Sequence, residues 1–410
     1  MLICLLAINN GSNMIYNASM SYLAYKTKLK LNNRAKTLMR QCAGYRRWLW
    51  NWALDFKQKA YKEEIKLNKS QLRKYYTNHV KPNFPWQSSL SSRIYQYVFI
   101  DLDEAMERFF KGVAKYPRFK KKGKSTNTFT IDAGGKPISI GGKLHKFPFF
   151  GWLKTHENLP ICSTKKITFS EQGGDWFVSF FVEVDFLPTG KTREKVGVDL
   201  GISKLATLSS GVVFENPKAY TKALKRLARL QRDLSRKVFQ SSNWYKAKLK
   251  VAKAHRKVAD IRQNAIHHLT SYLAKNHSQI IMEDLNVKGL IKNRHLSKAL
   301  SDAAFGTIRT QVEYKSERYD STLIIADRFF PSSQLCSNCG YRQKMPLKVR
   351  IFHCSRCRTR CDRDLNASLI LENYQNIAVG LTALRSVDGV LPTVPREADS
   401  KHQTRLSSFG

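Results

Sequence analysis

The chain has 410 residues, of which 42% are hydrophobic, so it is long enough to form two or three domains with separate cores. Its 71 Lys and Arg residues against 31 Asp and Glu give a net charge of +40, which does not fit an ordinary enzyme of small molecules. The expected partner is nucleic acid, because neutralising phosphates releases counterions. A membrane surface is the competing partner, but the sequence has no run of about 18 apolar residues that could span a bilayer.

The two ends of the chain are predicted to lie outside the folded part, as a disordered extension at 1–20 and a flexible tail at 375–410. The apolar run Leu2–Ile8 has neither a basic segment before it nor small residues for cleavage, so it does not fit a signal peptide. Met14 or Met20 is an alternative start of translation.

Residues 21–188 are predicted to form a β-rich module with a helical insertion at 41–111. Apolar and polar residues alternate in 21–32, and again in 176–184 after a Gly-Gly-Asp turn, as in half-exposed strands. Within the insertion, aromatic side chains recur at the four-residue steps of a helix: Trp48, Trp52 and Phe56. The β-rich part would then occupy 21–40 and 112–190.

A basic loop at 115–125 interleaves aromatic and cationic side chains, a composition typical of nucleic-acid contact. The residues expected to contact a nucleic-acid backbone are Arg118, Lys120, Lys121 and Lys122.

A second unit, with mixed strands and helices, is predicted over 191–374. Short apolar runs predict three strands between 196 and 214 and two more at 280–282 and 323–326. A helix is predicted between the last two strands, at 296–318.

Two long helices are predicted inside this unit, as an insertion at 215–270. Each has an apolar stripe and an opposite face crowded with Lys and Arg. Such a face is usually only solvated, but the three acidic residues described next predict a nuclease core around these helices, so we expect the face to contact phosphates.

Three acidic residues stand in apolar or helical contexts, and they are the candidate catalytic groups: Asp199, Glu283 and Asp364. Alternate residues of a strand share a face, so Gly197 and Gly201 flank Asp199 and would leave room for a bulky ligand. Periodicity does not choose between Glu283 and its neighbour Asp284, because these two residues face opposite sides of their strand.

Asp364 is predicted to face inward from a helix that starts near Asp362. Spacings of three and four residues place Asp364, Ala367 and Leu371 on one stripe, which would pack on a sheet. Asp362 is better placed as the N-cap of this helix.

Three inward carboxylates would repel one another unless cations neutralise them, and hard oxygen ligands favour Mg²⁺ or Mn²⁺ over zinc. Two such ions could activate a water and stabilise the leaving oxygen of a cleaved phosphodiester. The alternative is that the three acids are unrelated: a helix cap, an ion-pair partner and a loop anchor.

Two Cys-x-x-Cys pairs predict a closed structural zinc site formed by Cys336, Cys339, Cys354 and Cys357. Cys361 is either a competing ligand or a buried thiol. The remaining cysteines are scattered, which argues against a disulfide framework and for a reducing compartment such as the cytoplasm. The histidines show no ligand spacing.

The motifs around these residues resemble TnpB, the transposon-encoded family that is ancestral to the compact type V CRISPR effectors. They are Val-Gly-Val-Asp-Leu-Gly, Ile-Met-Glu-Asp-Leu-Asn-Val-Lys-Gly-Leu, Phe-Pro-Ser-Ser-Gln-Leu-Cys-Ser-Asn-Cys-Gly and Asp-Arg-Asp-Leu-Asn-Ala-Ser. The resemblance implies a RuvC-like, RNase H-type nuclease domain with Asp199, Glu283 and Asp364 as metal ligands, and so favours Glu283 over Asp284. It also implies a wedge β-barrel interrupted by a helical recognition domain, with a zinc knuckle at 330–360.

The resemblance further implies a guide RNA as partner and double-stranded DNA as substrate, recognised beside a short transposon-associated motif. Two positions depart from the family pattern: Arg358 follows the second cysteine pair where glycine is usual, and Ser368 replaces alanine. The expected function is therefore that of an RNA-guided DNA endonuclease, acting as a monomer. The alternatives are an RNA-guided DNA-binding regulator without cleavage, and a transposase, whose acids would normally follow the order Asp, Asp, Glu.

Overall fold

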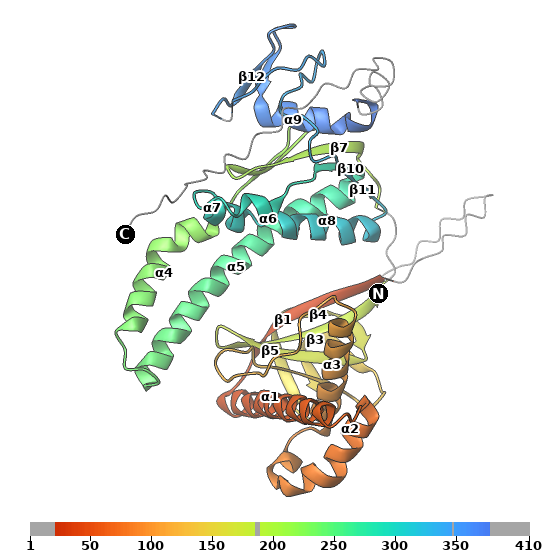
Figure 1. Cartoon of the computed structure of the whole chain (residues 1–410), viewed down its shortest axis with the longest axis vertical. Helices are drawn as coiled ribbons and strands as arrows, with labels where there is room; N and C mark the ends of the chain where they lie inside the picture. Colours follow the sequence, from red (N-terminus) through yellow and green to blue (C-terminus); the bar gives the residue numbers. More distant parts are fainter. Residues whose placement is uncertain (1–20, 185–188, 347, 378–410) are drawn as a thin grey trace, which may run out of the picture. The chain divides into compact units, whose positions relative to one another are not determined.

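The structure is a computed structural model that describes residues 21–184, 189–346 and 348–377, so the expected extension at 1–20 and nearly all of the expected tail lie outside the described residues (Figure 1). The described residues divide into two compact units, the first within 21–184 and 218–265 and the second within 189–217 and 266–377. Within the described ranges, no helix is both long enough and apolar enough to cross a membrane.

The first unit is built on a six-stranded antiparallel sheet with the order β2-β5-β6-β1-β4-β3. Its strands are β1 (Ser21–Lys30), β2 (Thr128–Asp132), β3 (Ile138–Phe147), β4 (Gly151–Thr164), β5 (Lys166–Gln172) and β6 (Asp175–Val184). Gly173 and Gly174, both at positive φ, form the predicted turn between β5 and β6. Alternate side chains of β6, among them Trp176 and Phe180, are buried in the core, as their spacing predicts.

The helical insertion comprises α1 (Asn33–Lys62), α2 (Lys69–Tyr75) and α3 (Ser92–Phe110), with three short helical turns between α2 and α3: η1 (Tyr76–Val80), η2 (Lys81–Asn83) and η3 (Pro85–Ser89). Helix α1 begins at Asn33, earlier than the predicted start at 41. The cause is local, because the side chain of Asn32 accepts a hydrogen bond from the backbone N–H of Ala35 at 2.8 Å and caps the helix.

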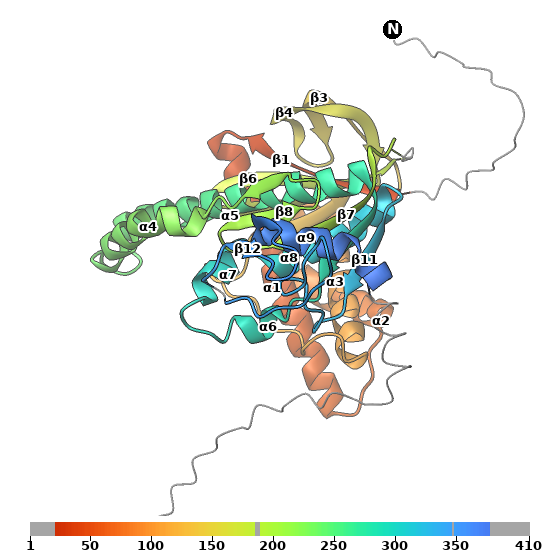
Figure 2. The same ribbon diagram turned by 90° about the horizontal axis from the view of Figure 1, so that it is seen from above.

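The two predicted basic helices are α4 (Ala219–Ser235) and α5 (Ser242–Asn276), which lie side by side in both views (Figures 1 and 2). Their pairing buries Leu227 of α4 and Val258 of α5 in one small cluster. Residues 218–265 belong to the first unit and not, as the sequence suggested, to the second. The guanidinium of Arg256 accounts for part of this, because it donates to the carboxylate of Asp175 at 2.7 Å.

The second unit is built on a five-stranded sheet with the order β11-β10-β7-β8-β9. Strands β7 (Arg193–Leu200), β8 (Lys204–Leu208) and β9 (Val213–Glu215) are antiparallel neighbours, whereas β10 (His277–Glu283) and β11 (Thr322–Ala326) continue the sheet in parallel from β7. The predicted helix at 296–318 is broken into α7 (Ser297–Ala303) and α8 (Phe305–Arg318), because Ala304 adopts a left-handed conformation with φ of 54°.

Two further pieces complete the second unit: the short helix α6 (Val287–Leu290), and a segment in which β12 (Ile351–His353) pairs with β13 (Arg360–Asp362) before α9 (Arg363–Glu372). Helix α9 packs along β7, as Figure 1 shows. The buried side chains of Ala367 and Leu371 confirm the predicted stripe, and Leu371 packs with Ile281 of β10.

Gly197 does not provide room for a ligand, contrary to the expectation from its position beside Asp199. A Cβ atom on Gly197 would stand 1.9 Å from the carbonyl oxygen of Ser368 and 2.5 Å from the backbone nitrogen of Glu372. Gly197 is therefore the residue that allows α9 to approach β7 closely.

Candidate functional site

Asp199 and Glu283 lie at the carboxyl ends of neighbouring parallel strands. Met282 of β10 pairs with Val198 of β7, so the next residue of each strand is one of the two acids. Side chains at the carboxyl ends of parallel strands line one edge of the sheet, where ligands bind in open α/β folds.

Asp364 joins this edge from the first turn of α9. The side chain of Asp362 accepts hydrogen bonds from the backbone N–H groups of Asp364 and Leu365, at 2.9 and 3.1 Å, and this confirms Asp362 as the N-cap. Asp362 and not Asp364 therefore caps the helix, and the charge of Asp364 acts on the buried carboxyl of Asp199.

Glu283 and Asp364 are close enough for their charges to act on the buried carboxyl of Asp199. Burial, followed by the negative charges of Glu283 and Asp364, raises the pKa of Asp199 well above its ordinary value. A carboxylate in this position is costly unless a cation lies beside it, and oxygen donors of this kind fit Mg²⁺ or Mn²⁺.

Among the described residues, the ligand atoms that gather in a group of three or more within 4.8 Å of one another belong to cysteines, so the three acids do not form a cluster of that compactness.

Asp284 forms ion pairs with two arginine residues. Its two carboxylate oxygens pair with the guanidinium groups of Arg309, at 2.7 Å, and Arg328, at 2.5 Å. Hydrogen bonds from these two residues hold its pKa below the ordinary value. Asp284 therefore joins β10 to α8 and to the segment after β11, while Glu283 is the neighbour of Asp199.

Two residues that sequence reasoning missed contact the acids. The hydroxyl of buried Ser332 donates a hydrogen bond to the carboxylate of Glu283. The guanidinium of Arg350, which is largely exposed, lies 3.9 Å from the carboxylate of Asp364. Ser332 belongs to the Phe-Pro-Ser-Ser motif, and its position before the first cysteine pair could have indicated its role. The sequence around Arg350 gives no such indication.

The four predicted cysteines form a compact cluster. The Sγ atoms of Cys336 and Cys357 are 3.5 Å apart, those of Cys339 and Cys354 are 3.6 Å apart, and all four lie within 4.8 Å of one another. A tetrahedral zinc ion with Zn–S bonds of about 2.3 Å requires sulfurs about 3.8 Å apart, so this set fits such an ion. Cys361 is not in the cluster; its Sγ lies 3.9 Å from the Asn366 side chain.

The cysteine cluster is tied to the helix that carries Asp364. The side chain of Asn366 accepts a hydrogen bond from the backbone N–H of Ser337, at 2.9 Å, and donates one to the carbonyl of Leu335, at 2.6 Å. Asn366 is buried and lies two residues beyond Asp364. Its hydrogen bonds therefore link the position of the cysteine cluster to the position of Asp364.

The four predicted basic contacts lie in the first unit and differ from one another. Arg118, Lys121 and Lys122 are exposed. Lys120 is partly buried: its ammonium lies 3.5 Å from the ring centroid of Trp50, and burial lowers its pKa to about 7. The side chain of Asn51 also holds the Lys120 backbone through two hydrogen bonds, so Lys120 is a packing residue more than a surface cation.

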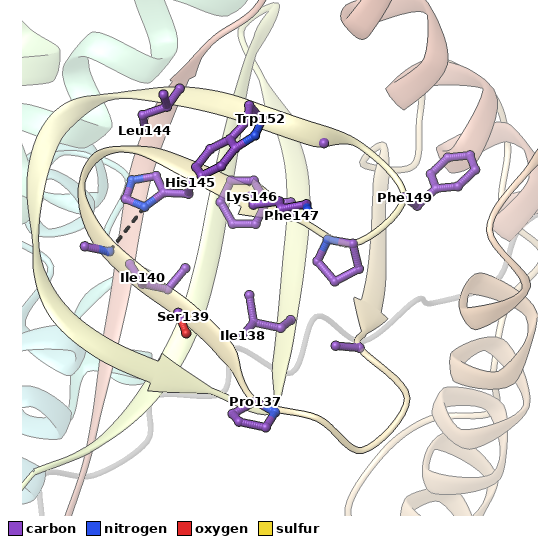
Figure 3. Close-up of a pocket in the computed structure, with 14 residues that line it drawn as sticks. Pro137, Ile138, Ser139, Ile140, Leu144, His145, Lys146, Phe147, Phe149 and Trp152 are labelled. Atoms are coloured by element: carbon purple, nitrogen blue, oxygen red, sulfur yellow. Dashed lines mark hydrogen bonds between the residues drawn. The ribbon is translucent and has the colours of Figure 1, made fainter.

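The first unit also contains an open pocket of about 710 Å³ with a mainly apolar lining, formed largely by β3 and the turn that leads into β4 (Figure 3). The ring of His145 points toward the backbone N–H of Gly141 and accepts its hydrogen bond at 3.3 Å. Trp152 lies at the wall, with 63% of its surface exposed. The lining contains neither an acid nor a cysteine, so this pocket offers no set of groups for hydrolysis.

Comparison with protein-family models places the chain among transposon-encoded proteins. Residues 179–294 match a family described as a probable transposase, and residues 305–371 match the Cas12f1-like TNB domain. Residues 20–66 match a model described as a helix-turn-helix domain, although here they form strand β1 followed by the single long helix α1.

Two curated relatives extend this match. A putative RNA-guided DNA endonuclease from Streptomyces pristinaespiralis is 34% identical, over 90% of this chain and 92% of the relative. The putative RNA-guided DNA endonuclease InsQ from Escherichia coli K12 is 32% identical, over 69% and 74%. The chain belongs to the TnpB family.

A solved structure, the Cas12f1–sgRNA–target DNA complex, has the same general fold. It aligns with a TM-score of 0.50 and 13% identity, and covers 84% of each chain.

Proposed function

We propose that this protein is an RNA-guided endonuclease that cleaves double-stranded DNA next to a short transposon-associated motif. The observation that supports the proposal is that Asp199 and Glu283 lie at the carboxyl ends of neighbouring strands, where the charge of Asp364 also acts on Asp199. The names of its relatives, putative RNA-guided DNA endonucleases, support the same conclusion.

The second unit would be a RuvC-like, RNase H-type nuclease core. Three antiparallel strands followed by two parallel ones, with the first strand in the centre, support this assignment. The first unit would supply the wedge β-barrel, with α1, α2 and α3 as the helical recognition domain. A chain of net charge +40 is suited to hold a guide RNA and its paired target strand through their phosphates, while base pairing reads the sequence.

The three acids would hold Mg²⁺ or Mn²⁺, which when bound activates water and stabilises the leaving oxygen of the phosphodiester. Asp199 and Glu283 would act as rigid ligands, since each lies within the last two residues of a strand of the sheet. The Ser332 hydroxyl orients Glu283 by its hydrogen bond. Asp364 is positioned by the cap of Asp362, and Arg350 beside it offers a cation for a substrate phosphate.

The four-cysteine cluster would hold a structural Zn²⁺ ion. The four sulfurs leave no open position, so hydrolysis would not take place there. Its role would be to fix the segment before α9 through Asn366, and thereby the direction of Asp364.

A plasmid assay tests this function. The purified protein is mixed with guide RNA from its own element and a supercoiled target plasmid that carries the flanking motif, with Mg²⁺ or with EDTA. We expect linear product only when guide, motif and Mg²⁺ are all present.

The two alternatives give different products in this assay. A guide-dependent shift of the plasmid in a gel without any cut would identify a DNA-binding regulator. Joined DNA ends would identify a transposase, the activity in the description of the matching family. Cleavage that proceeds equally well without guide RNA would contradict the proposal.

A further inference from the structure

The loop that joins α4 and α5 presents apolar side chains at the end of a basic helical hairpin. Val238 and Phe239 are 79% and 70% exposed, and Tyr245, in the first turn of α5, is 54% exposed. Single exposed apolar residues are common on protein surfaces, but a group of them at the end of a hairpin calls for a partner.

The aromatic residues of this tip form one organised cluster. The ring of Phe239 meets the ring of Trp244 edge-on, with centroids 5.0 Å apart, and Trp244 meets Tyr245 in the same way at 5.1 Å. The ammonium of Lys248 lies 4.8 Å from the ring centroid of Trp244. Trp244 therefore packs against Phe239, while most of the surface of Phe239 remains exposed.

The backbone holds this loop in one defined shape. The side chain of Ser241 accepts a hydrogen bond from the N–H of Trp244 at 3.1 Å and starts α5, while its own N–H donates to the carbonyl of Val238 at 3.1 Å. Gln240 has a φ of 64°, a left-handed conformation that is uncommon outside glycine. A short, strained turn of this kind fixes the direction of Phe239.

The charge around the tip indicates the chemistry of the partner. Asp233 is the single acidic residue of the sequence between 219 and 257, and it is paired with Lys237 at 3.1 Å. Cations on both sides of the tip include Arg232, Arg236, Lys246 and Lys250. An apolar or protein partner would not require this charge, whereas a polyanion with exposed aromatic faces matches both features, and that polyanion is a nucleic acid.

We propose that Phe239 is a base-stacking residue, which packs on an exposed nucleobase face while the neighbouring cations bind the adjacent phosphates. Such a face occurs at the end of a duplex and in an unpaired strand. The inference builds on the proposed RNA-guided function, because it needs a nucleic acid held by this chain, but it does not depend on cleavage.

The test uses the full-length protein without divalent metal and a blunt-ended RNA–DNA duplex with 2-aminopurine in its terminal base pair. A matched duplex carries the probe at its centre, and a single strand carries it at one end. We expect the wild-type protein to change the fluorescence of a terminal probe but not of the central one. A fluorescence change in the duplex would show that Phe239 stacks on the end of a duplex, and a change in the single strand would show that it stacks on an unpaired base.

Phe239→Ala is expected to remove the terminal signal and to weaken binding about tenfold, in keeping with the loss of one base–aromatic stack. Phe239→Trp is expected to retain both. Phe110→Ala, which removes an equally exposed phenylalanine from the end of α3, is the matched control and should behave as wild type. Circular dichroism checks that all variants are folded.

Two results would overturn the inference. One is a Phe239→Ala protein whose terminal signal and affinity equal those of the wild type. The other is a wild-type dimer that Phe239→Ala converts to a monomer with unchanged nucleic-acid binding, which would assign the tip to self-association. A protein that gives the terminal signal but cuts no plasmid would contradict only the proposed function.

Discussion

Gly197 in the central strand of the second sheet lies directly against Ser368 of the helix that carries Asp364, with no space for a side chain between them. This contact sets the distance between the strand of one candidate ligand, Asp199, and the helix of another. The separation of the two acids therefore depends on a residue that cannot itself bind a metal.

Gly197→Ala is expected to destabilise the protein by about 3 kcal/mol, because the new methyl group meets backbone atoms that cannot rotate away. Urea unfolding measures this. Gly306→Ala is the control: it lies in α8, an added Cβ meets nothing within 4 Å, and it should be neutral or slightly stabilising. Equal stability of Gly197→Ala and wild type would show that α9 does not pack on β7 in this way.

Asp284→Asn is expected to lower the midpoint temperature of unfolding slightly while guide-directed cleavage continues. The substitution removes the charge that pairs with Arg309 and Arg328, but these groups are partly exposed, so the loss is small. Calorimetry measures the midpoint, and the plasmid assay measures cleavage. Cleavage abolished in a folded Asp284→Asn protein would place this acid in the reaction.

Loss of the zinc ion from the four-cysteine cluster is expected to slow cleavage at least tenfold while leaving the first unit folded. Four thiolates without their ion repel or take up protons, and the link from Ser337 to Asn366 is lost with the knuckle. Cys354→Ser should release about one equivalent of zinc, measured by a chromogenic chelator, and reduce cleavage at least tenfold. Cys361→Ser, outside the cluster, should retain both the zinc and the activity.

Lys120 is expected to make the free energy of unfolding of the first unit depend on pH. Burial lowers its pKa to about 7 from the ordinary value of 10.5, so between these values the unfolded chain binds more protons than the folded one. Its contribution to the free energy of unfolding should therefore rise with pH across this range. Unfolding of the wild type and Lys120→Met, compared at pH 6, 8 and 10, should show a difference that favours the wild type increasingly at high pH.

The exposed neighbour provides the control for this measurement. Lys121→Met is the matched variant, because it removes one ammonium from an adjacent side chain that lies at the surface. A pH-independent difference for Lys120→Met would mean that its ammonium is not buried on Trp50.

The local parts of the site were predictable from the sequence. Three features depend on spacings of only a few residues: the N-cap role of Asp362, the inward stripe of α9 and the four-cysteine cluster. A helix or a turn fixes the relative positions of residues that are this close in the sequence. The strands that carry Asp199 and Glu283 were equally visible as short apolar runs, although their adjacency was not.

Features that depend on a distant partner were not predictable. Periodicity placed Gly197 on the correct face but could not show that α9 covers it. The charge of Lys120 was plain, yet nothing in the sequence shows that Trp50 lies beneath its ammonium. The helix break at Ala304 requires a left-handed alanine, which no local signal indicates. The sequence likewise gives no indication that Asp284 pairs with Arg309 and Arg328.

The most direct test of the account is single-turnover cleavage of target DNA by guide-bound protein in Mg²⁺, compared across five substitutions. Asp199→Asn, Glu283→Gln and Asp364→Asn should each lower the rate at least about a thousandfold without loss of target binding, as expected when a metal ligand is removed. Asp362→Asn, which keeps a helix cap, and Asp284→Asn should stay within about tenfold of the wild type. Wild-type rates in any folded variant of the first three would contradict the assignment of a shared metal site.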